Sequence, residues 1–499
     1  MKMELLSLHA AAFALLMAPA AAAEQLSAGA GFGARPVENC GTDLSYLNQV
    51  TGWQTAWPAE WTAIASAPAD EKAQDAALTR WREAPNALQA DIAGMKAGLR
   101  AKRAAPRSVA LRVLQQTDGL LVALGEDGSA YYAAPGPKFS TEWRALLEQE
   151  IAPAIASYRA FLSDEYLPKL HEKSALASLK DDGACFMNAA RWWTTLSLPS
   201  AEIEAAGERL LVETKADLVA HSATGESIDE ILDRLRRAPQ EVPTSSEDLM
   251  RASDAALKRA VSALPSWFSA VPTSGISVRA MPEHMQSSFP AGFYQPPSGA
   301  GLDGTYVINP SRPSDRRLMA EAIAFHEGVP GHHLFFAWPR ESNVGDFNSG
   351  IVEGWAIYAE TLADEMGLYA TPLDREGMLA KHLWAASRLI IEPRLHSGRW
   401  TRGQAIDFMR ETTALPIEEI EIEIDRYLAM PGQSLAYMLG AETILAARAR
   451  AKAAFGDDFD IRKFHDVILE PGLRPLPALV AAVDDWIAEG ARQGDDGSL

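Results

Sequence analysis

Apolar residues recur every three or four positions along most of this chain, the spacing that places them on one face of an α-helix. The pattern predicts helices over 58–104, 140–179 and 246–264, and again from 314 to 490. Few glycines or prolines interrupt these stretches. We therefore expect a mainly α fold.

Two segments depart from the helical period. Residues 108–133 contain two short apolar runs followed by Asp127 and Gly128, which predicts a β-hairpin. The region 281–313, rich in proline and glycine, holds the strand-like run 304–309. We expect this small β element to lie beside a helical site, where a free strand edge could pair with an extended peptide. A plain loop is the alternative.

The first residues follow the pattern of a secretory signal peptide. Lys2 precedes an apolar run from Leu5 to Met17, and the small residues Ala21–Ala23 come next. The run is short for a membrane span. We expect residues 1–23 to be removed on export, which predicts a periplasmic or secreted protein with no membrane anchor in the mature chain. A buried N-terminal helix is the alternative.

The pattern divides the remaining chain into three parts. Residues 24–135 are expected to form an N-terminal helical segment with the possible hairpin. Residues 136–490 form a larger helical region that carries the candidate chemistry, and 491–499 are expected to be a flexible tail.

Charge narrows the range of partners. The chain of 499 residues has 46 basic and 66 acidic side chains and a formal net charge of −20. No basic surplus exists to pair with phosphates, so we expect neither nucleic acid nor an anionic membrane as a partner.

The chain has only two cysteines, Cys40 and Cys185. An exported protein meets an oxidising compartment, where two cysteines permit one bridge. We expect a Cys40–Cys185 disulfide that ties the N-terminal segment to the main body. Two buried free thiols are the alternative.

The strongest chemical signal is the run His326-Glu327-Gly328-Val329-Pro330-Gly331-His332. Zinc peptidases of the His-Glu-x-x-His type place two histidines one helical turn apart, with the glutamate near the bound water. Here Pro330 breaks the helix, and a distorted turn could return His332 to a metal. His333 would need less distortion and stays an alternative, as does a solvated histidine cluster.

Acidic residues follow on a second predicted helix, 349–366. Glu353, Glu360 and Asp364 share one face of this mostly apolar helix. Because buried carboxylates of like charge repel, the stripe favours a cation. Glu353 is the candidate third zinc ligand, and Glu360 or Asp364 could hold a ligating imidazole. An acidic solvent-facing surface is the alternative.

Two further groups are candidates for stabilising an oxyanion. Arg388, Glu392 and His396 share one helical face, where Arg388 and Glu392 could form a simple ion pair. His396 could donate to a developing oxyanion or be a surface histidine. Tyr437 could supply a hydroxyl near zinc or pack in the core.

These motifs together resemble the bacterial family catalogued as domain of unknown function 885. The resemblance spans roughly 140–490 and rests on four runs in order, which are 326–332, 353–360, 388–402 and 431–440. This chain has arginine at position 394, where the family has glycine.

The family in turn resembles the helical zinc peptidases of the zincin clan. The resemblance implies a large helical, zincin-like metallopeptidase and favours His332 over His333 as a ligand.

We therefore expect Zn²⁺ held by His326, His332 and Glu353, with Glu327 as the base in the hydrolysis of a peptide substrate. His396 and Tyr437 would stabilise the oxyanion. A zinc hydrolase of esters or non-peptide amides is one alternative. A catalytically silent peptide-binding protein on the same fold is another.

Overall fold

The computed structural model describes residues 47–65, 70–173, 176–178, 183–222, 225–241, 244–287, 289–297, 303–340 and 348–496. Helices dominate this part of the chain, and a single three-stranded sheet accompanies them. The expectation of a mainly α fold with a small β element is confirmed. The predicted signal peptide, residues 1–23, lies outside the described residues.

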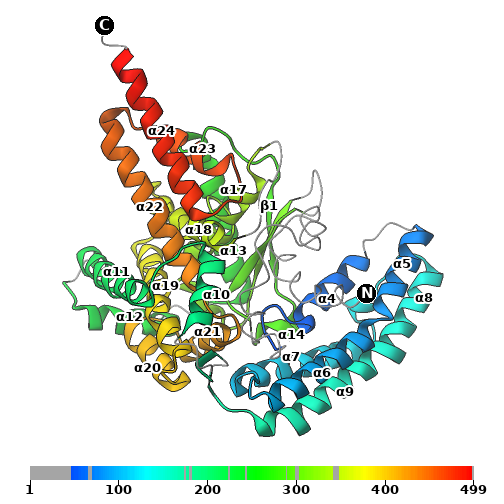
Figure 1. Ribbon diagram of the computed structural model, residues 1–499. Helices are drawn as coiled ribbons and strands as arrows, with labels where there is room; N and C mark the ends of the chain where they lie inside the picture. Colours follow the sequence, from blue (N-terminus) through cyan, green and yellow to red (C-terminus); the bar gives the residue numbers. More distant parts are fainter. Residues whose placement is uncertain are drawn as a thin grey trace.

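The N-terminal helices form a bundle that lies to one side in Figure 1. They are α4 (Trp53–Ile64), α5 (Glu71–Trp81), α6 (Ala84–Arg100), α7 (Arg107–Gly125), α8 (Pro137–Leu146) and α9 (Ala152–Ala160). Tryptophans fill the core of the bundle: the ring of Trp81 lies 5.6 Å from that of Trp61 and 6.2 Å from that of Trp143. Trp143 belongs to α8, so the bundle continues past the boundary predicted at residue 135. Pro137, near that position, is the first residue of α8.

The hairpin predicted over 108–133 is wrong, because α7 runs through most of it. The two apolar runs fit either a helix or a strand when read alone. Val109, Val113, Leu120 and Leu124 are buried, and their spacing of four, seven and four residues is helical. Gly128, with φ of +86°, lies in the turn after the helix.

Among the remaining helices, α18 and α22 contact each other closely, and α11 packs along α19. The helices are α10 (Ala184–Thr194), α11 (Ser200–His221), α12 (Ile228–Glu241), α13 (Ser246–Ala263), α14 (Glu283–Gln286), α15 (Pro313–Arg317), α16 (Ala320–Glu327), α17 (His332–Ala337), α18 (Ser349–Glu365), α19 (Pro372–His396), α20 (Arg402–Thr412), α21 (Ile417–Ala429), α22 (Leu435–Phe455), α23 (Ile461–Leu469) and α24 (Leu476–Asp496). A Cβ on Gly354 of α18 would lie 2.5 Å from the Cα of Gly440 on α22. Two glycines therefore let the backbones of these helices touch.

The predicted disulfide and the predicted C-terminal tail each lie partly within the described residues. Cys185, near the start of α10, is disulfide-bonded. Its expected partner Cys40 lies outside the described residues. The tail expected from residue 491 is helical as far as Asp496, where α24 ends.

The sheet consists of β1 (Ile276–Ala280), β2 (Gly292–Gln295) and β3 (Gly304–Ile308) in the order β1-β3-β2. β3 pairs in parallel with β1 and antiparallel with β2. The predicted strand at 304–309 is confirmed, but its expected free edge is wrong. All five residues of β3 are buried, as suits a central strand. Within the described residues the free edges of the sheet belong to β1 and β2.

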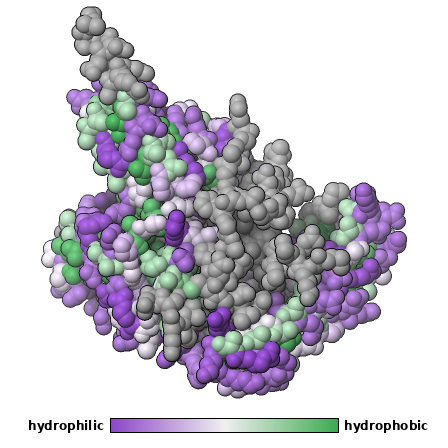
Figure 2. All heavy atoms as spheres, in the orientation of Figure 1, coloured by the Kyte–Doolittle hydropathy of each residue, from purple (hydrophilic) through white to green (hydrophobic). Residues whose placement is uncertain are grey.

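The outer faces of the helices are polar. Hydrophilic residues cover much of the N-terminal bundle in the view of Figure 2. Large apolar side chains that reach solvent, such as Val122, Val212 and Ile417, are scattered over different helices. Within the described residues, no helix is long and apolar enough to cross a membrane.

Candidate metal centre

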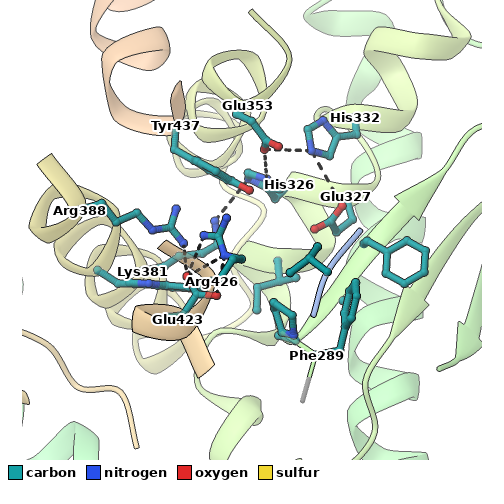
Figure 3. A pocket seen from close by; sticks show the side chains of 17 residues that line it. Phe289, His326, Glu327, His332, Glu353, Lys381, Arg388, Glu423, Arg426 and Tyr437 are labelled. Atoms are coloured by element: carbon teal, nitrogen blue, oxygen red, sulfur yellow. Dashed lines mark hydrogen bonds and ion pairs between the residues drawn. The ribbon is translucent and has the colours of Figure 1, made fainter. Parts of the chain in front are cut away.

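His326, His332 and Glu353 converge at one side of a buried cavity, as Figure 3 shows. They come from three helices, α16, α17 and α18, and each is at most 3% exposed. The Nε2 atoms of His326 and His332 lie 3.4 and 3.5 Å from Oε2 of Glu353. One candidate ligand atom from each residue lies within 4.8 Å of the others, so the predicted ligand set is brought together.

The four residues between α16 and α17 turn His332 back toward His326. The helix ends at Glu327, and the loop contains a cis peptide bond between Val329 and Pro330. A Cβ on Gly331 would lie 2.0 Å from the carbonyl oxygen of His326, so only glycine fits there. Trp355 of α18 holds the loop from the other side, since its Nε1 donates to the carbonyl of Pro330 at 2.9 Å.

His333, the alternative ligand, points away from this group. Its Nδ1 lies 2.9 Å from the hydroxyl of Tyr294 on β2, and its Nε2 lies 3.0 Å from the carbonyl of Ser274. Both ring nitrogens are therefore used in fixing α17 to the sheet region. The structure favours His332 over His333 as the metal ligand.

The donor set fits a metal ion. Both carboxylate oxygens of Glu353 are buried without a hydrogen-bond partner, an arrangement that is costly unless a cation compensates it. The separations of 3.4 and 3.5 Å exceed those of normal N–H···O bonds. Two ligands each about 2.0–2.1 Å from a tetrahedral zinc ion would lie about 3.3–3.4 Å apart. Burial alone would raise the pKa of Glu353, but the two imidazoles hold it well below its usual range.

Glu360 lies about two helical turns beyond Glu353 on α18 and fixes the orientation of His326. Its Oε1 lies 2.7 Å from Nδ1 of the imidazole and also pairs with Lys381 of α19. A carboxylate there favours the tautomer with hydrogen on Nδ1 and leaves Nε2 available to a metal. Asp364, the alternative for this role, instead forms a two-pronged pair with Arg375 at 2.6 and 2.7 Å.

Glu327 lies beside the same group. Its Oε2 is 4.0 Å from Nε2 of His332 and has no hydrogen-bond partner. Burial raises the pKa of Glu327, and the neighbouring His326 and His332 oppose that shift. A carboxylate with a raised pKa and an open oxygen is suited to accept and return a proton.

Tyr437 of α22 forms the adjoining wall of the cavity. Its ring stacks on that of His326, with centroids 5.8 Å apart and planes 11° from parallel. Burial raises the pKa of Tyr437, so its hydroxyl keeps its proton. The cavity has an empty volume of ≈ 770 Å³, part of it open to solvent. Its apolar side includes Phe289, Phe293 and Val50, the last contributed by the segment that leads into the N-terminal bundle.

His396 is not brought to this group. It is 1% exposed, so it is no surface histidine, and it is absent from the cavity lining. Its Nε2 lies 3.1 Å from the carbonyl of Tyr427, and its ring stacks on Phe186. Glu392 accepts hydrogen bonds from Gly432 and Ser434. Glu392 thus anchors the loop that leads into α22, and His396 packs beside Glu392 outside the cavity.

Arg394, at the position where the family has glycine, also lies outside the cavity. Its Nε donates to Glu204 of α11 at 2.8 Å, and its guanidinium lies over the ring of Trp400. The departure from the family pattern at this position therefore lies at a contact between α19 and α11, away from the cavity.

A cluster of charged residues that the sequence did not predict lines the other side of the cavity. A simple ion pair with Glu392 was one possibility for Arg388, but its Nη2 lies 3.2 Å from Glu423 of α21. Arg426 pairs with the same carboxylate at 2.8 Å. The spacing of Glu423 and Arg426 along α21 indicates a local pair. No pattern in the sequence indicates that α19 brings Arg388 to it.

The chain belongs to the family described as "Bacterial protein of unknown function (DUF885)", which it matches over residues 6–483. Its fold is similar to that of a crystal structure described as "the putative lipoprotein from Colwellia psychrerythraea", with a TM-score of 0.77 and 23% sequence identity over 89% of this chain and 80% of that chain. It is also similar to "a putative lipoprotein of unknown function from Shewanella oneidensis", with a TM-score of 0.58 and 17% identity over 86% of this chain and 84% of that chain. At these identities the likeness establishes the fold alone. No curated protein matches the chain.

Proposed function

We propose that this protein is a zinc-dependent hydrolase of peptide bonds, with His326, His332 and Glu353 as the zinc ligands. The observation that carries the proposal is the buried, unpartnered carboxylate of Glu353 at 3.4 and 3.5 Å from two imidazole nitrogens. When bound, a zinc ion in such a site activates water and polarises a carbonyl group. The resemblance to zincin-clan peptidases points to the same chemistry.

The side chains around the ligands supply the proton transfers. Glu327 is placed to take a proton from a water molecule in the cavity and to pass it to the departing amine nitrogen. The reaction breaks the C–N bond, adds the hydroxyl of water to the acyl carbon and adds its proton to the amine. The hydroxyl of Tyr437 is the group we assign to the carbonyl oxygen as negative charge develops there.

The substrate would enter along β2. Gly292 and Phe293 of this strand line the cavity, and its edge away from β3 is unpaired within the described residues. An extended peptide could add to that edge by backbone hydrogen bonds, the role first expected of β3. Phe289 and Phe293 offer an apolar surface for a substrate side chain.

A hydrolase of esters or non-peptide amides would use the same groups, because the site acts on any polarised carbonyl. A silent binding protein would need neither Glu327 nor its open oxygen, so the presence of Glu327 beside the candidate ligands favours catalysis. We also propose that the protein acts outside the cytoplasm, as the signal-peptide pattern of residues 1–23 indicates.

The test compares the wild type with Glu327→Gln after both are loaded with zinc. Metal content is measured by mass spectrometry, and hydrolysis is measured on a mixed peptide pool and an ester panel. We expect one zinc per chain in both proteins and a loss of hydrolysis of about 10²–10⁴-fold in the variant. A metal-free wild type with full activity would contradict the proposal. Cleavage of esters alone would favour the alternative hydrolase.

A further inference from the structure

Arg388 lies in the cavity between two aromatic rings. Its guanidinium carbon is 4.3 Å from the ring centroid of Trp384 and 4.4 Å from that of Tyr437. Stacking of this kind covers the faces of the guanidinium and leaves its N–H groups to donate at the edges. The position of Arg388 is thus set by its neighbours before any ligand binds.

Two of the three nitrogens of that guanidinium have partners. Nε donates to the hydroxyl of Tyr427 at 3.0 Å, and Nη2 donates to Glu423 at 3.2 Å. Among the described residues, Nη1 has no hydrogen-bond acceptor, while Arg388 lines the cavity. An arginine with one uncommitted nitrogen at a cavity wall can accept an anionic group from a ligand.

The cluster of Arg388, Arg426 and Glu423 has a surplus of positive charge, which also favours an anionic ligand. Arg388 and Arg426 share the single carboxylate of Glu423, so one positive charge is left over among the three. Burial raises the pKa of the adjacent Tyr427, so this phenol does not supply the missing negative charge. Arg426 is committed, because its nitrogens donate to Glu423 and Gln433. Arg388 is therefore the residue left to meet an anion.

The distance from this arginine to the candidate metal centre limits what can lie between them. The Tyr437 ring centroid is 5.8 Å from that of His326 and 4.4 Å from the guanidinium carbon of Arg388. The His326 ring centroid and the guanidinium carbon of Arg388 can therefore be no farther apart than the sum of these two distances. For a peptide bound in extended form, in which each residue spans about 3.3–3.6 Å, this limit leaves room for one or two residues between the reacting carbonyl and Arg388.

We propose that Arg388 binds the C-terminal carboxylate of the peptide, so that the protein is a carboxypeptidase that removes one or two residues. This inference rests on the proposed function, since it assigns the substrate class of the same site. A carboxylate can also come from an aspartate or glutamate side chain near the scissile bond. The chain terminus is favoured because the short separation places the end of the substrate at Arg388.

The test uses the zinc-loaded full-length protein and matched peptides with a blocked N-terminus. One peptide ends in a free acid and its twin ends in an amide. A further amidated pair carries aspartate or asparagine near the scissile bond. We expect the free acid to be cleaved on the order of 100-fold faster than the amide, with loss of one or two C-terminal residues. A rate advantage confined to the aspartate peptide would replace the terminus with a side chain as the ligand.

Variants separate binding of the carboxylate from a purely structural role. Arg388→Gln should abolish the preference for the acid, and Arg388→Lys, which keeps the charge, should retain part of it. The matched control is Arg410→Gln, since Arg410 forms an exposed pair with Asp407 on α20. The control should keep the wild-type ratio of rates. If Arg388→Gln does not fold, the ratio of the acid and amide cleavage rates of the wild type still tests the carboxypeptidase assignment.

The outcomes for the two proposals differ. Equal cleavage of acid and amide, or internal cleavage, would overturn the carboxypeptidase assignment and leave peptide hydrolysis standing. If neither peptide is cleaved, hydrolysis fails, and calorimetry with zinc-loaded Glu327→Gln decides on the carboxylate site. Tighter binding of the acid than of the amide then supports Arg388 as its ligand, and equal affinities contradict it.

Discussion

The two ends of the cavity bury charge in opposite ways. At the metal end, Glu353 holds two carboxylate oxygens without hydrogen-bond partners, and two imidazole nitrogens lie too far away to donate well. At the other end, Glu423 receives donors from Arg388 and Arg426, and the same arginines stack on aromatic rings. One end is short of positive charge, and the other has one more than it needs.

The difference indicates what each end is built to bind. A buried carboxylate without donors is unfavourable by itself, so it marks the place of a cation. A nearly saturated pair of arginines is stable by itself, and its one free nitrogen marks the place of an anion. Tyr437 lies between the ends and contacts both, with its ring stacked on His326 and covered by Arg388.

The largest effect we predict comes from breaking the metal end at its loop. In Gly331→Ala the new Cβ would meet the backbone oxygen of His326 at 2.0 Å, and backbone cannot move aside cheaply. We expect zinc binding to be lost and the free energy of unfolding to fall by about 3 kcal/mol or more. Metal analysis and thermal denaturation measure both.

Gly403→Ala is the control for this variant. Gly403 lies near the start of α20, where the nearest atom to a new Cβ is 3.9 Å away. Alanine is the better helix former, so this variant should keep its zinc and its stability. Wild-type zinc content in Gly331→Ala would show that the loop does not place His332.

Removing the hydroxyl of Tyr437, whose ring contacts both ends, should have the next largest effect. Tyr437→Phe keeps the ring, and with it the stacking against His326 and Arg388. If the hydroxyl stabilises the oxyanion, kcat should fall about 10²–10³-fold, with zinc content and the preference for the free acid unchanged. Steady-state kinetics on the acid and amide peptides separate these quantities. An unchanged kcat would assign Tyr437 to packing alone.

A smaller effect is expected from the group that orients His326. Glu360→Gln removes the charge that favours hydrogen on Nδ1, and zinc affinity should fall about 10–100-fold in a competition assay with a chelator. Asp364→Asn is the matched control on the same helix, since Asp364 pairs with Arg375 away from the metal centre. Equal losses in the two variants would mean that the helix is sensitive to any lost carboxylate.

The smallest predicted effect is the pH dependence of stability caused by His465. This buried histidine has neutral partners, whereas His326 and His332 at the metal end lie beside carboxylates. His465 accepts from the hydroxyl of Tyr358 through Nε2 at 2.8 Å, and its Nδ1 lies 2.9 Å from the carbonyl of Trp267. Burial lowers the pKa of His465 to about 3. The unfolded chain therefore takes up this proton first, and stability is lost as pH falls below the unfolded pKa.

Between pH 7 and pH 5 this histidine should cost about 2 kcal/mol of stability, given an unfolded pKa of about 6.5. Denaturant unfolding at the two pH values measures the loss. His465→Gln removes the titrating group and should reduce the pH dependence by that amount. A wild type and variant with the same pH dependence would contradict the burial effect.

Periodicity was enough to predict the helices that carry the site. The spacing of Glu353 and Glu360 on one face of α18 is a local property, and so is the stop at Gly367. The same reasoning failed at α7, because its short apolar runs fit two periods and only the burial of Val113 and Leu120 separates them.

Features that depend on packing between distant segments could not be predicted. The spacing of the histidines left His332 and His333 open, and only the family resemblance favoured His332. In the structure the choice depends on Tyr294 and Ser274 from the sheet region, which bind His333. The arginine end joins α19 to α21, and no spacing rule connects two helices. The pairing of β3 on both edges likewise depends on β1, which precedes it by more than twenty residues.

The central claim is that His326, His332 and Glu353 together bind zinc. The most direct measurement is the zinc content of the wild type and of Glu353→Gln after exposure to zinc and extensive dialysis. We predict one tightly held zinc ion per chain in the wild type, and a variant that folds but releases its metal. A wild type that retains no zinc, or a Glu353→Gln variant that retains as much as the wild type, would contradict the account.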